Sequence, residues 1–194
     1  MPKACLAVFL IAWVALAISP KYPADWLLEN LLTFAAVPVL VFTHRRFAFS
    51  DRAYVQGTVF LILHTIGSHY TYAETPIGDW LRGPFGFERN HYDRIVHFLF
   101  GVLLFLPLRE LIGRRSRLRP GMLDLLAVSA VIALSAVYEI VEWITASLAD
   151  PAAGAAYLGT QGDEWDAQKD MALAWGGGVL AGLAERLRHV WKEK

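Results

Sequence analysis

Apolar runs of about twenty residues recur along the whole chain, and no other feature constrains the fold as strongly. A helix rises about 1.5 Å per residue, so a run of this length can cross the hydrocarbon core of a bilayer. Hydrophobic residues make up 56% of the chain and charged residues only 19%. This balance favours a protein surrounded by lipid over a soluble domain.

Six segments fit this description, and the breaks between them are polar or rich in proline and glycine. They are Ala4–Ile18, Trp26–Thr43, Ala53–Tyr70, Tyr92–Leu108, Met122–Leu148 and Asp166–His189. Backbone groups in lipid must hydrogen bond within their own segment, so each segment is expected to be helical. We therefore predict one all-α domain over residues 1–194, a polytopic membrane helix bundle with about six transmembrane helices.

The first segment allows a second interpretation. Lys3, a short apolar run and the small residues Ala15 and Ala17 also resemble a secretory signal with its cleavage site. Cleavage there would remove the first crossing and leave the order of the remaining helices unchanged.

Arginines and lysines concentrate in alternate connections and in the C-terminal tail. They are Arg45, Arg46, Arg52, Arg109, Arg114, Arg115, Arg117, Arg119, Arg186, Arg188, Lys192 and Lys194. Basic loops mark the cytoplasmic side, so six crossings predict that both termini are cytoplasmic and that the acidic connections face outward. Because topology accounts for these short basic loops, nucleic-acid binding is not expected.

Polar residues from four expected helices fall in the outer half of the membrane. His97 follows Asp93 by one helical turn, so their side chains share a face. Glu139 and Glu142 lie well inside the fifth segment, where a carboxylate costs about 2.5–3.5 kcal/mol and normally pairs or serves a function. We therefore expect an outward-facing polar pocket. Its lining would be His64, His69, Asp93, His97, Glu139, Glu142, Asp166 and Asp170.

Histidines and carboxylates that converge from different helices can hold a divalent metal ion or relay protons. The expected metal ligands are His64, His69, His97, Asp163, Asp166 and Asp170. The expected catalytic residues are Asp93, Glu139 and Glu142 as acids and bases, and Arg94 as the partner of a phosphate. A divalent metal ion is the cofactor that this residue set indicates.

Some of these residues also have purely structural interpretations. Asp163 can cap the sixth helix and favour its positive end. Arg94 can pair with Asp93 or Glu139 between helices. His64 can hydrogen bond to a carbonyl of a neighbouring helix.

Two features of the sixth segment depend on where its helix begins and how it packs. Asp163, Asp166 and Asp170 are spaced by three and then four residues, so they share one stripe only if the helix already includes Asp163. Gly176, Gly177 and Gly178 lie in mid-helix, where small residues let two helices approach closely.

Four motifs carry a resemblance to a known family. In chain order they read HTIGSHYTY at 64–72, RNHYDRIVHF at 89–98, YEIVEW at 138–143 and GTQGDEWDAQKDM at 159–171. Together they resemble the YjdF-like family of bacterial inner-membrane proteins. The resemblance implies a location in the bacterial cytoplasmic membrane and a shared polar site, and it implies no reaction.

A more distant similarity links the chain to the VanZ-like family, which is associated with glycopeptide resistance. It rests on Asp93 to His97, Glu139, Gln161 and Asp170, followed by a glycine-rich helix. The chain departs from that family at Ala174, where an asparagine is usual. This resemblance also supplies no reaction.

The favoured functional hypothesis is an enzyme in the lipid bilayer that acts on a lipid or lipid-linked envelope substrate. The chain has no His-Glu-x-x-His motif and no evident nucleophilic serine, which counts against this hypothesis. The first alternative is a proton-coupled transporter, although six helices without an inverted repeat would need a homodimer to supply the missing half. The second is a structural membrane partner protein whose polar cluster locks the helices together.

Overall fold

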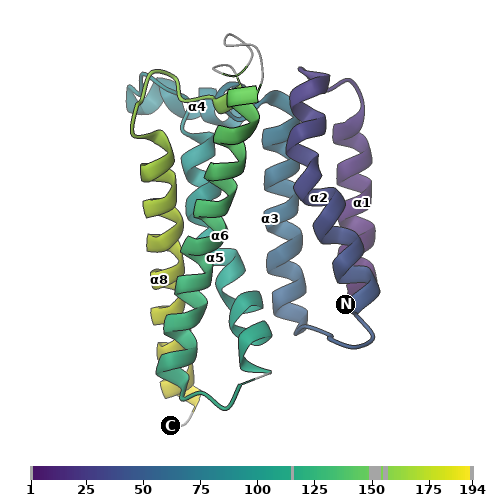
Figure 1. Cartoon of the computed structure of the whole chain (residues 1–194), viewed down its shortest axis with the longest axis vertical. Coiled ribbons are helices and arrows are strands. Elements are labelled where there is room, and N and C mark those ends of the chain that lie inside the picture. The colour runs from purple at the N-terminus through teal and green to yellow at the C-terminus, as the bar shows by residue number, and fades with distance from the viewer. Residues whose placement is uncertain (1, 115, 149–153, 155–156, 193–194) are drawn as a thin grey trace.

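The computed structural model describes residues 2–114, 116–148, 154 and 157–192. Within these residues the protein is all-helical, which confirms the predicted fold class. In chain order the elements are α1 (Pro2–Ala17), α2 (Pro23–Thr43), α3 (Asp51–Tyr70), the short 3-10 helix η1 (Tyr72–Glu74), α4 (Pro76–Phe85), α5 (Tyr92–Gly113), α6 (Pro120–Leu148) and α8 (Asp166–Lys192). The six long helices overlap the six apolar segments and run side by side along the bundle (Figure 1).

Local sequence sets several of the helix ends. Pro23 and Pro76 occupy the first turns of α2 and α4, where a missing backbone N–H costs nothing. The Ser50 hydroxyl accepts a hydrogen bond of 3.2 Å from the backbone N–H of Ala53 and caps α3. Gly86 ends α4 in the left-handed conformation, with φ at 63°.

The central helix of the bundle is α5, which packs against α3, α6 and α8, while α1 and α2 are attached through α3. Glycines bring α5 and α8 into close contact. A Cβ atom at Gly101 would lie 2.0 Å from the carbonyl oxygen of Ala174, and one at Gly177 would lie 2.2 Å from that of Phe98. The predicted role of the glycine run in close helix approach is thus confirmed for Gly177, whereas Gly176 faces open space.

Large apolar side chains cover the outside of the bundle, as expected for a surface in contact with lipid. Ile11, Phe42 and Val137 are among the exposed ones. Among the described residues, α2, α5 and α6 are long and apolar enough to cross a membrane, and α1 is apolar but has only 16 residues. The structure therefore identifies three candidate spans, fewer than the six crossings expected from the sequence.

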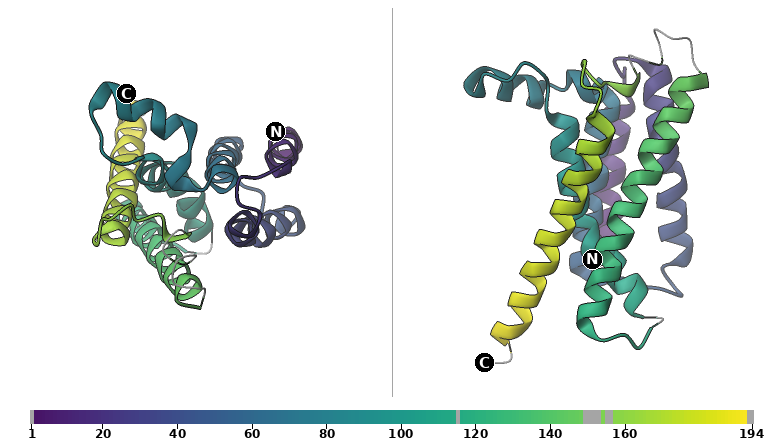
Figure 2. Two further views of the ribbon diagram at one scale, coloured as in Figure 1. Left: turned by 90° about the horizontal axis from the view of Figure 1, so that it is seen from above. Right: turned by 60° about the vertical axis from the view of Figure 1, so that its left-hand side comes forward.

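The two ends of the bundle differ. At one end lie the start of α1, the connections α2–α3 and α5–α6, and the end of α8 (Figure 1), and these carry most of the arginines and lysines. At the other end, α4 lies across the bundle (Figure 2). The prolines and glycines of this stretch predict a break between two helices. It is a ten-residue helix that exposes Ile77, Trp80 and Phe85.

Candidate functional site

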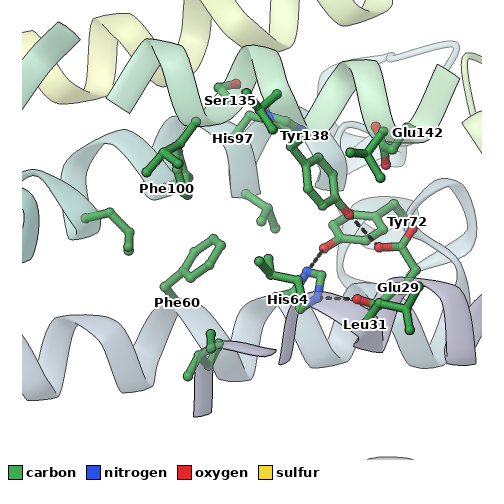
Figure 3. A pocket seen from close by; sticks show the side chains of 18 of the residues that line it. Glu29, Leu31, Phe60, His64, Tyr72, His97, Phe100, Ser135, Tyr138 and Glu142 are labelled. Carbon is green, nitrogen blue, oxygen red and sulfur yellow. Dashed lines mark hydrogen bonds between the residues drawn. The ribbon is translucent and has the colours of Figure 1, made fainter. Parts of the chain in front are cut away.

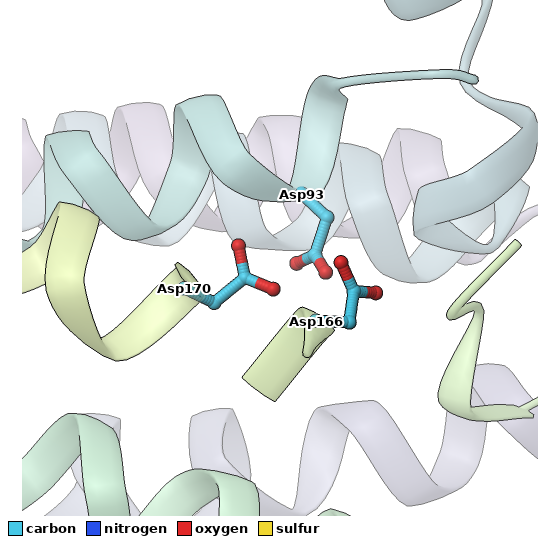
Figure 4. Close-up of side chains that lie close together, drawn as sticks. All are labelled: Asp93, Asp166 and Asp170. Carbon is cyan, nitrogen blue, oxygen red and sulfur yellow. The ribbon is translucent and has the colours of Figure 1, made fainter. Parts of the chain in front are cut away.

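Three aspartates meet at the α4 end of the bundle. Asp93 lies in the first turn of α5, and Asp166 and Asp170 lie one turn apart at the start of α8. One carboxylate oxygen from each lies within 4.8 Å of the others, and the three side chains point toward one another (Figure 4). We call these three residues the aspartate cluster. Two oxygens on opposite sides of a cation are separated by twice the metal–oxygen distance, about 4–5 Å for Mg²⁺ or Ca²⁺, so the cluster can hold a divalent cation.

His97 and Glu139 extend the aspartate cluster toward α6. His97 Nε2 lies 3.5 Å from Asp93 Oδ1 and 3.4 Å from Glu139 Oε1. The expected shared face of Asp93 and His97 is therefore present. The other ring nitrogen of His97 faces the Ser135 hydroxyl at 3.5 Å. The imidazole thus stands between two carboxylates and can carry a proton from one to the other.

Two arginines border the aspartate cluster on the side of the α8 loop. Arg89 donates to both oxygens of Asp166, at 2.5 and 3.1 Å. Arg94 donates to Asp166 Oδ1 at 3.1 Å and also hydrogen bonds to Asp163. Asp166 is consequently charge-paired, whereas Asp170 Oδ1 is buried and finds no hydrogen-bond partner in the part of the chain that the structure describes.

Buried amide side chains fix the loops that carry this site. Asn90 is fully buried and accepts a hydrogen bond of 3.0 Å from the N–H of Tyr92, which orients the start of α5. Its amide group also donates to the carbonyl of Thr75 at 2.9 Å. The Gln161 side chain pairs with both backbone groups of Asn90, at 2.8 and 3.0 Å, so the loop before α8 is held against the start of α5.

Asp163 lies in the turn before α8, not in the helix. Its Oδ1 accepts a hydrogen bond from the backbone N–H of Trp165 at 3.1 Å, so it acts as a cap, one of the two interpretations that the sequence allowed. The helix begins at Asp166, and the three aspartates of this segment therefore do not form one helical stripe. Lys169, the Trp165 N–H and Arg94 together lower the pKa of Asp163 to about 2.

This lowered pKa predicts an acid sensitivity. A carboxylate whose pKa falls on folding stabilises the folded state at neutral pH, and the contribution is lost as the pH falls from the ordinary value of 3.8 toward about 2. We expect Asp163→Asn to lower the melting temperature of the detergent-purified protein at pH 6. The difference from the parent protein should shrink steadily below pH 4. A difference that stays constant down to pH 2 would contradict this role.

A largely apolar cavity of about 410 Å³ lies next to the aspartate cluster, between α2, α3, α5 and α6. His97 links the aspartate cluster to the cavity, since its Nε2 contacts Asp93 and its ring lines the cavity. Polar groups gather at one end of the cavity, where His64 Nδ1 lies 2.5 Å from the Tyr72 hydroxyl and Tyr138 donates to Glu29 Oε2 at 2.6 Å (Figure 3). Glu142 lines the same end.

Apart from His69, the residues expected in one pocket are thus distributed over two neighbouring groups. Asp93, His97, Glu139, Asp166 and Asp170 form or adjoin the aspartate cluster, while Glu142 and His64 line the apolar cavity.

Both histidines of α3 are engaged away from the aspartate cluster. His64 Nε2 lies 3.0 Å from the carbonyl of Glu29, the structural alternative stated above, and its other nitrogen faces Tyr72. His69 Nδ1 contacts the carbonyl of Leu16 on α1 at 2.8 Å. His64 is held by Glu29 and Tyr72, and His69 by Leu16. Among the described residues, the group that could hold a metal ion therefore includes neither ring.

Sequence reasoning missed two residues that shape the site. Arg89 lies within one of the four family motifs, and nothing local in the sequence distinguishes it from other interfacial arginines. Glu29 is not among the predicted site residues, yet it is 6% exposed and lines the cavity. Its position as a lone carboxylate between leucines in an apolar segment is the signal that could have identified it.

Helices of this length and hydropathy, with their lipid-facing apolar surfaces, define a helical membrane protein. The chain matches the family described as a predicted membrane protein (DUF2238) over residues 1–190, and it belongs to that family. It is 36% identical over 158 residues to the inner membrane protein YjdF of Escherichia coli (strain K12), a stretch covering 81% of this chain and 75% of that protein. The resemblance drawn from the four motifs is confirmed. No solved structure matches the chain.

Proposed function

We propose that this protein is an enzyme of the bacterial inner membrane that binds a divalent cation at its outer end and acts on a lipid or lipid-linked substrate. In this proposal six helices cross the bilayer, and the basic end of the bundle, with both termini, is cytoplasmic. The name of the YjdF relative and the gathering of basic residues at one end support the location and the orientation. A single chain would suffice, because the aspartate cluster and the cavity are formed within it.

The observation that carries the proposal is the buried, unpaired oxygen of Asp170 within the aspartate cluster. Asp170 is 2% exposed, and its Oδ1 has no hydrogen-bond partner among the described residues. Burying a carboxylate oxygen without a partner is costly, and a bound cation would remove that cost. Arg89 and Arg94 are directed to Asp166 and Asp163, so they leave Asp93 and Asp170 to supply the negative charge.

A cation at this position would lie beside groups that can move protons. Such an ion polarises an oxygen of a bound substrate or activates a water molecule. His97 contacts Asp93 and Glu139 and also lines the cavity, so in this proposal it passes a proton between these carboxylates and a lipid in the cavity. Glu142 lines the cavity itself and would face the substrate.

A second candidate function is a structural lock between helices. It is favoured by the pairing of Asp166 with Arg89 and Arg94, which joins α5 to α8 without any ligand. Under this alternative, substitutions in the aspartate cluster would reduce stability and change no ligand binding. A proton-coupled transporter remains the third hypothesis, and it predicts flux across liposomes.

Metal analysis of the purified protein tests the proposal. Protein incubated with magnesium, manganese or zinc and then desalted should retain near-stoichiometric metal. Asp170→Asn should retain about tenfold less, because it removes one charged ligand of the cluster. Glu164→Gln removes an exposed carboxylate from the adjacent loop and should retain the metal of the parent.

The same variants separate the alternatives. Asp170→Asn is expected to keep its melting temperature, or raise it, because the amide removes a buried charge. No metal in the parent protein, with each of the three ions, would overturn the cation site. A large fall in melting temperature with no metal in either protein would instead support the structural lock.

A further inference from the structure

We propose that the apolar cavity binds an amphiphile with a hydrocarbon chain and a head that donates hydrogen bonds, a hydroxyl or a protonated amine. The inference deepens the proposed function, because it names the class of lipid that the enzyme would take. The binding site itself requires no cation.

The shape and lining of the cavity favour a hydrocarbon chain. Its volume of about 410 Å³ lies within the range of about 300–1,000 Å³ found for small-molecule sites. Away from the polar end, Phe60 and Phe100 contribute to an apolar wall (Figure 3). Leu104 also lines the cavity. An apolar stretch with polar groups at one end matches a molecule that lies along the helices with its head toward the outer surface.

The charge of the polar end selects the head group. Glu29 and Glu142 contribute carboxyl groups, and Tyr72 and Tyr138 contribute phenols. Among the described residues, no lysine or arginine lines the cavity. A phosphate or carboxylate head would therefore be buried beside carboxyl groups without a compensating cation, whereas a hydroxyl or an ammonium group finds acceptors.

The polar end is built rather than incidental, because its groups are held by one another across three helices. Glu29 on α2 is only 6% exposed and accepts from Tyr138 on α6. His64 on α3 uses one nitrogen for the Glu29 carbonyl and the other for Tyr72. The Glu29 carbonyl can only accept, so Nε2 carries the ring hydrogen, and Nδ1 can accept from the Tyr72 hydroxyl, an arrangement that satisfies a neutral imidazole.

The cavity opens sideways to the bilayer. In the described residues α2 packs along α3 and has no extensive packing with α6, although both helices line the cavity. Leu31 on α2 and Val137 on α6 are each 56% exposed while they line it. A membrane amphiphile could therefore reach the site between α2 and α6 without leaving the lipid phase.

The test measures retention of hexadecylamine, hexadecanol and palmitate by the full-length protein in nanodiscs, using native mass spectrometry. Hexadecylamine and hexadecanol should be retained about tenfold more strongly than palmitate, the scale of one hydrogen bond to a charged group. Glu29→Gln should weaken the retention of hexadecylamine more than that of hexadecanol, because only the amine loses an ion pair with the Glu29 carboxylate.

A pair of glycine variants controls for non-specific binding. Gly57 lines the cavity and Gly176 does not, and a Cβ atom at either position meets no atom within 4 Å. Gly57→Leu should abolish retention of the amine and the alcohol by occupying the cavity, whereas Gly176→Leu should bind like the parent. Equal binding of palmitate, or unchanged binding in Gly57→Leu, would overturn the proposal.

Failure here is distinguishable from failure of the cation site. Retention is measured in EDTA, with the parent protein and with Asp170→Asn. Selective retention by both proteins in EDTA would uphold the amphiphile site. If the parent protein also retained no metal in the separate metal analysis without EDTA, the cation site alone would be rejected. Bound metal in the metal analysis, without selective retention of the amphiphiles, would uphold the cation site and reject the amphiphile site.

Discussion

Gly177→Ala should destabilise the protein by about 3 kcal/mol, the upper end of the usual cost of overpacking. The added methyl group would lie 2.2 Å from the carbonyl oxygen of Phe98 and 3.1 Å from the backbone nitrogen of Val102. These are backbone atoms of α5 and cannot rotate aside, so the two helices would have to separate. Thermal or denaturant unfolding in detergent micelles measures the effect.

Gly176→Ala is the matched control for this substitution. It adds the same methyl group to the same helix, one residue away, at a position where no other described part of the bundle comes within 4 Å. Its stability should equal that of the parent or rise slightly, because alanine has the higher helix propensity. Equal destabilisation by both variants would show that the close approach of α5 and α8 is not the cause.

The helices were predictable because a long apolar run has few alternatives in lipid. The segment Trp26–Thr43, for example, corresponds to α2, which begins only three residues earlier. Helix α4 was missed because Pro76 and Pro84 resemble breaks in the sequence. Pro76 occupies the first turn, where proline is compatible with a helix, and Pro84 lies in the last turn.

The site was predictable only where its geometry is local. Helical spacing alone places His97 beside Asp93, and the structure brings the two together. The pairing of Arg89 with Asp166 spans 77 residues, and the bond from Tyr138 to Glu29 spans 109. Contacts of this kind depend on the rotation of each helix about its own axis, which one sequence does not define.

The same limit explains why the two histidines of α3 could not be placed from sequence. His69 lies only five residues after His64, yet it contacts α1, whereas His64 contacts α2. Five residues along a helix turn the side chain by well over a full rotation, so the two rings face different neighbours. Residue type indicated a ligand in both cases, and only the packing shows which helix each ring meets.

Asp124→Asn should also have a large effect, at the opposite end of the bundle. Asp124 on α6 is 5% exposed and accepts hydrogen bonds from Arg109 Nε at 2.7 Å and Arg186 Nε at 2.8 Å. The carboxylate thereby joins α5, α6 and α8 through two cationic partners. Breaking a buried ion pair from one side costs about 3–5 kcal/mol, and because Arg186 is half exposed we expect about 3 kcal/mol.

A double variant isolates the reason for that loss. Asp124→Leu alone leaves the partly buried guanidinium of Arg109 without its carboxylate. Adding Arg109→Leu removes the orphaned charge, so the double variant should unfold at a higher temperature than Asp124→Leu, measured in the same micelles. If the losses of stability caused by Asp124→Leu and by Arg109→Leu simply add in the double variant, Asp124 stabilises the bundle through packing at the start of α6. The hydrogen bond to Arg109 would then contribute little.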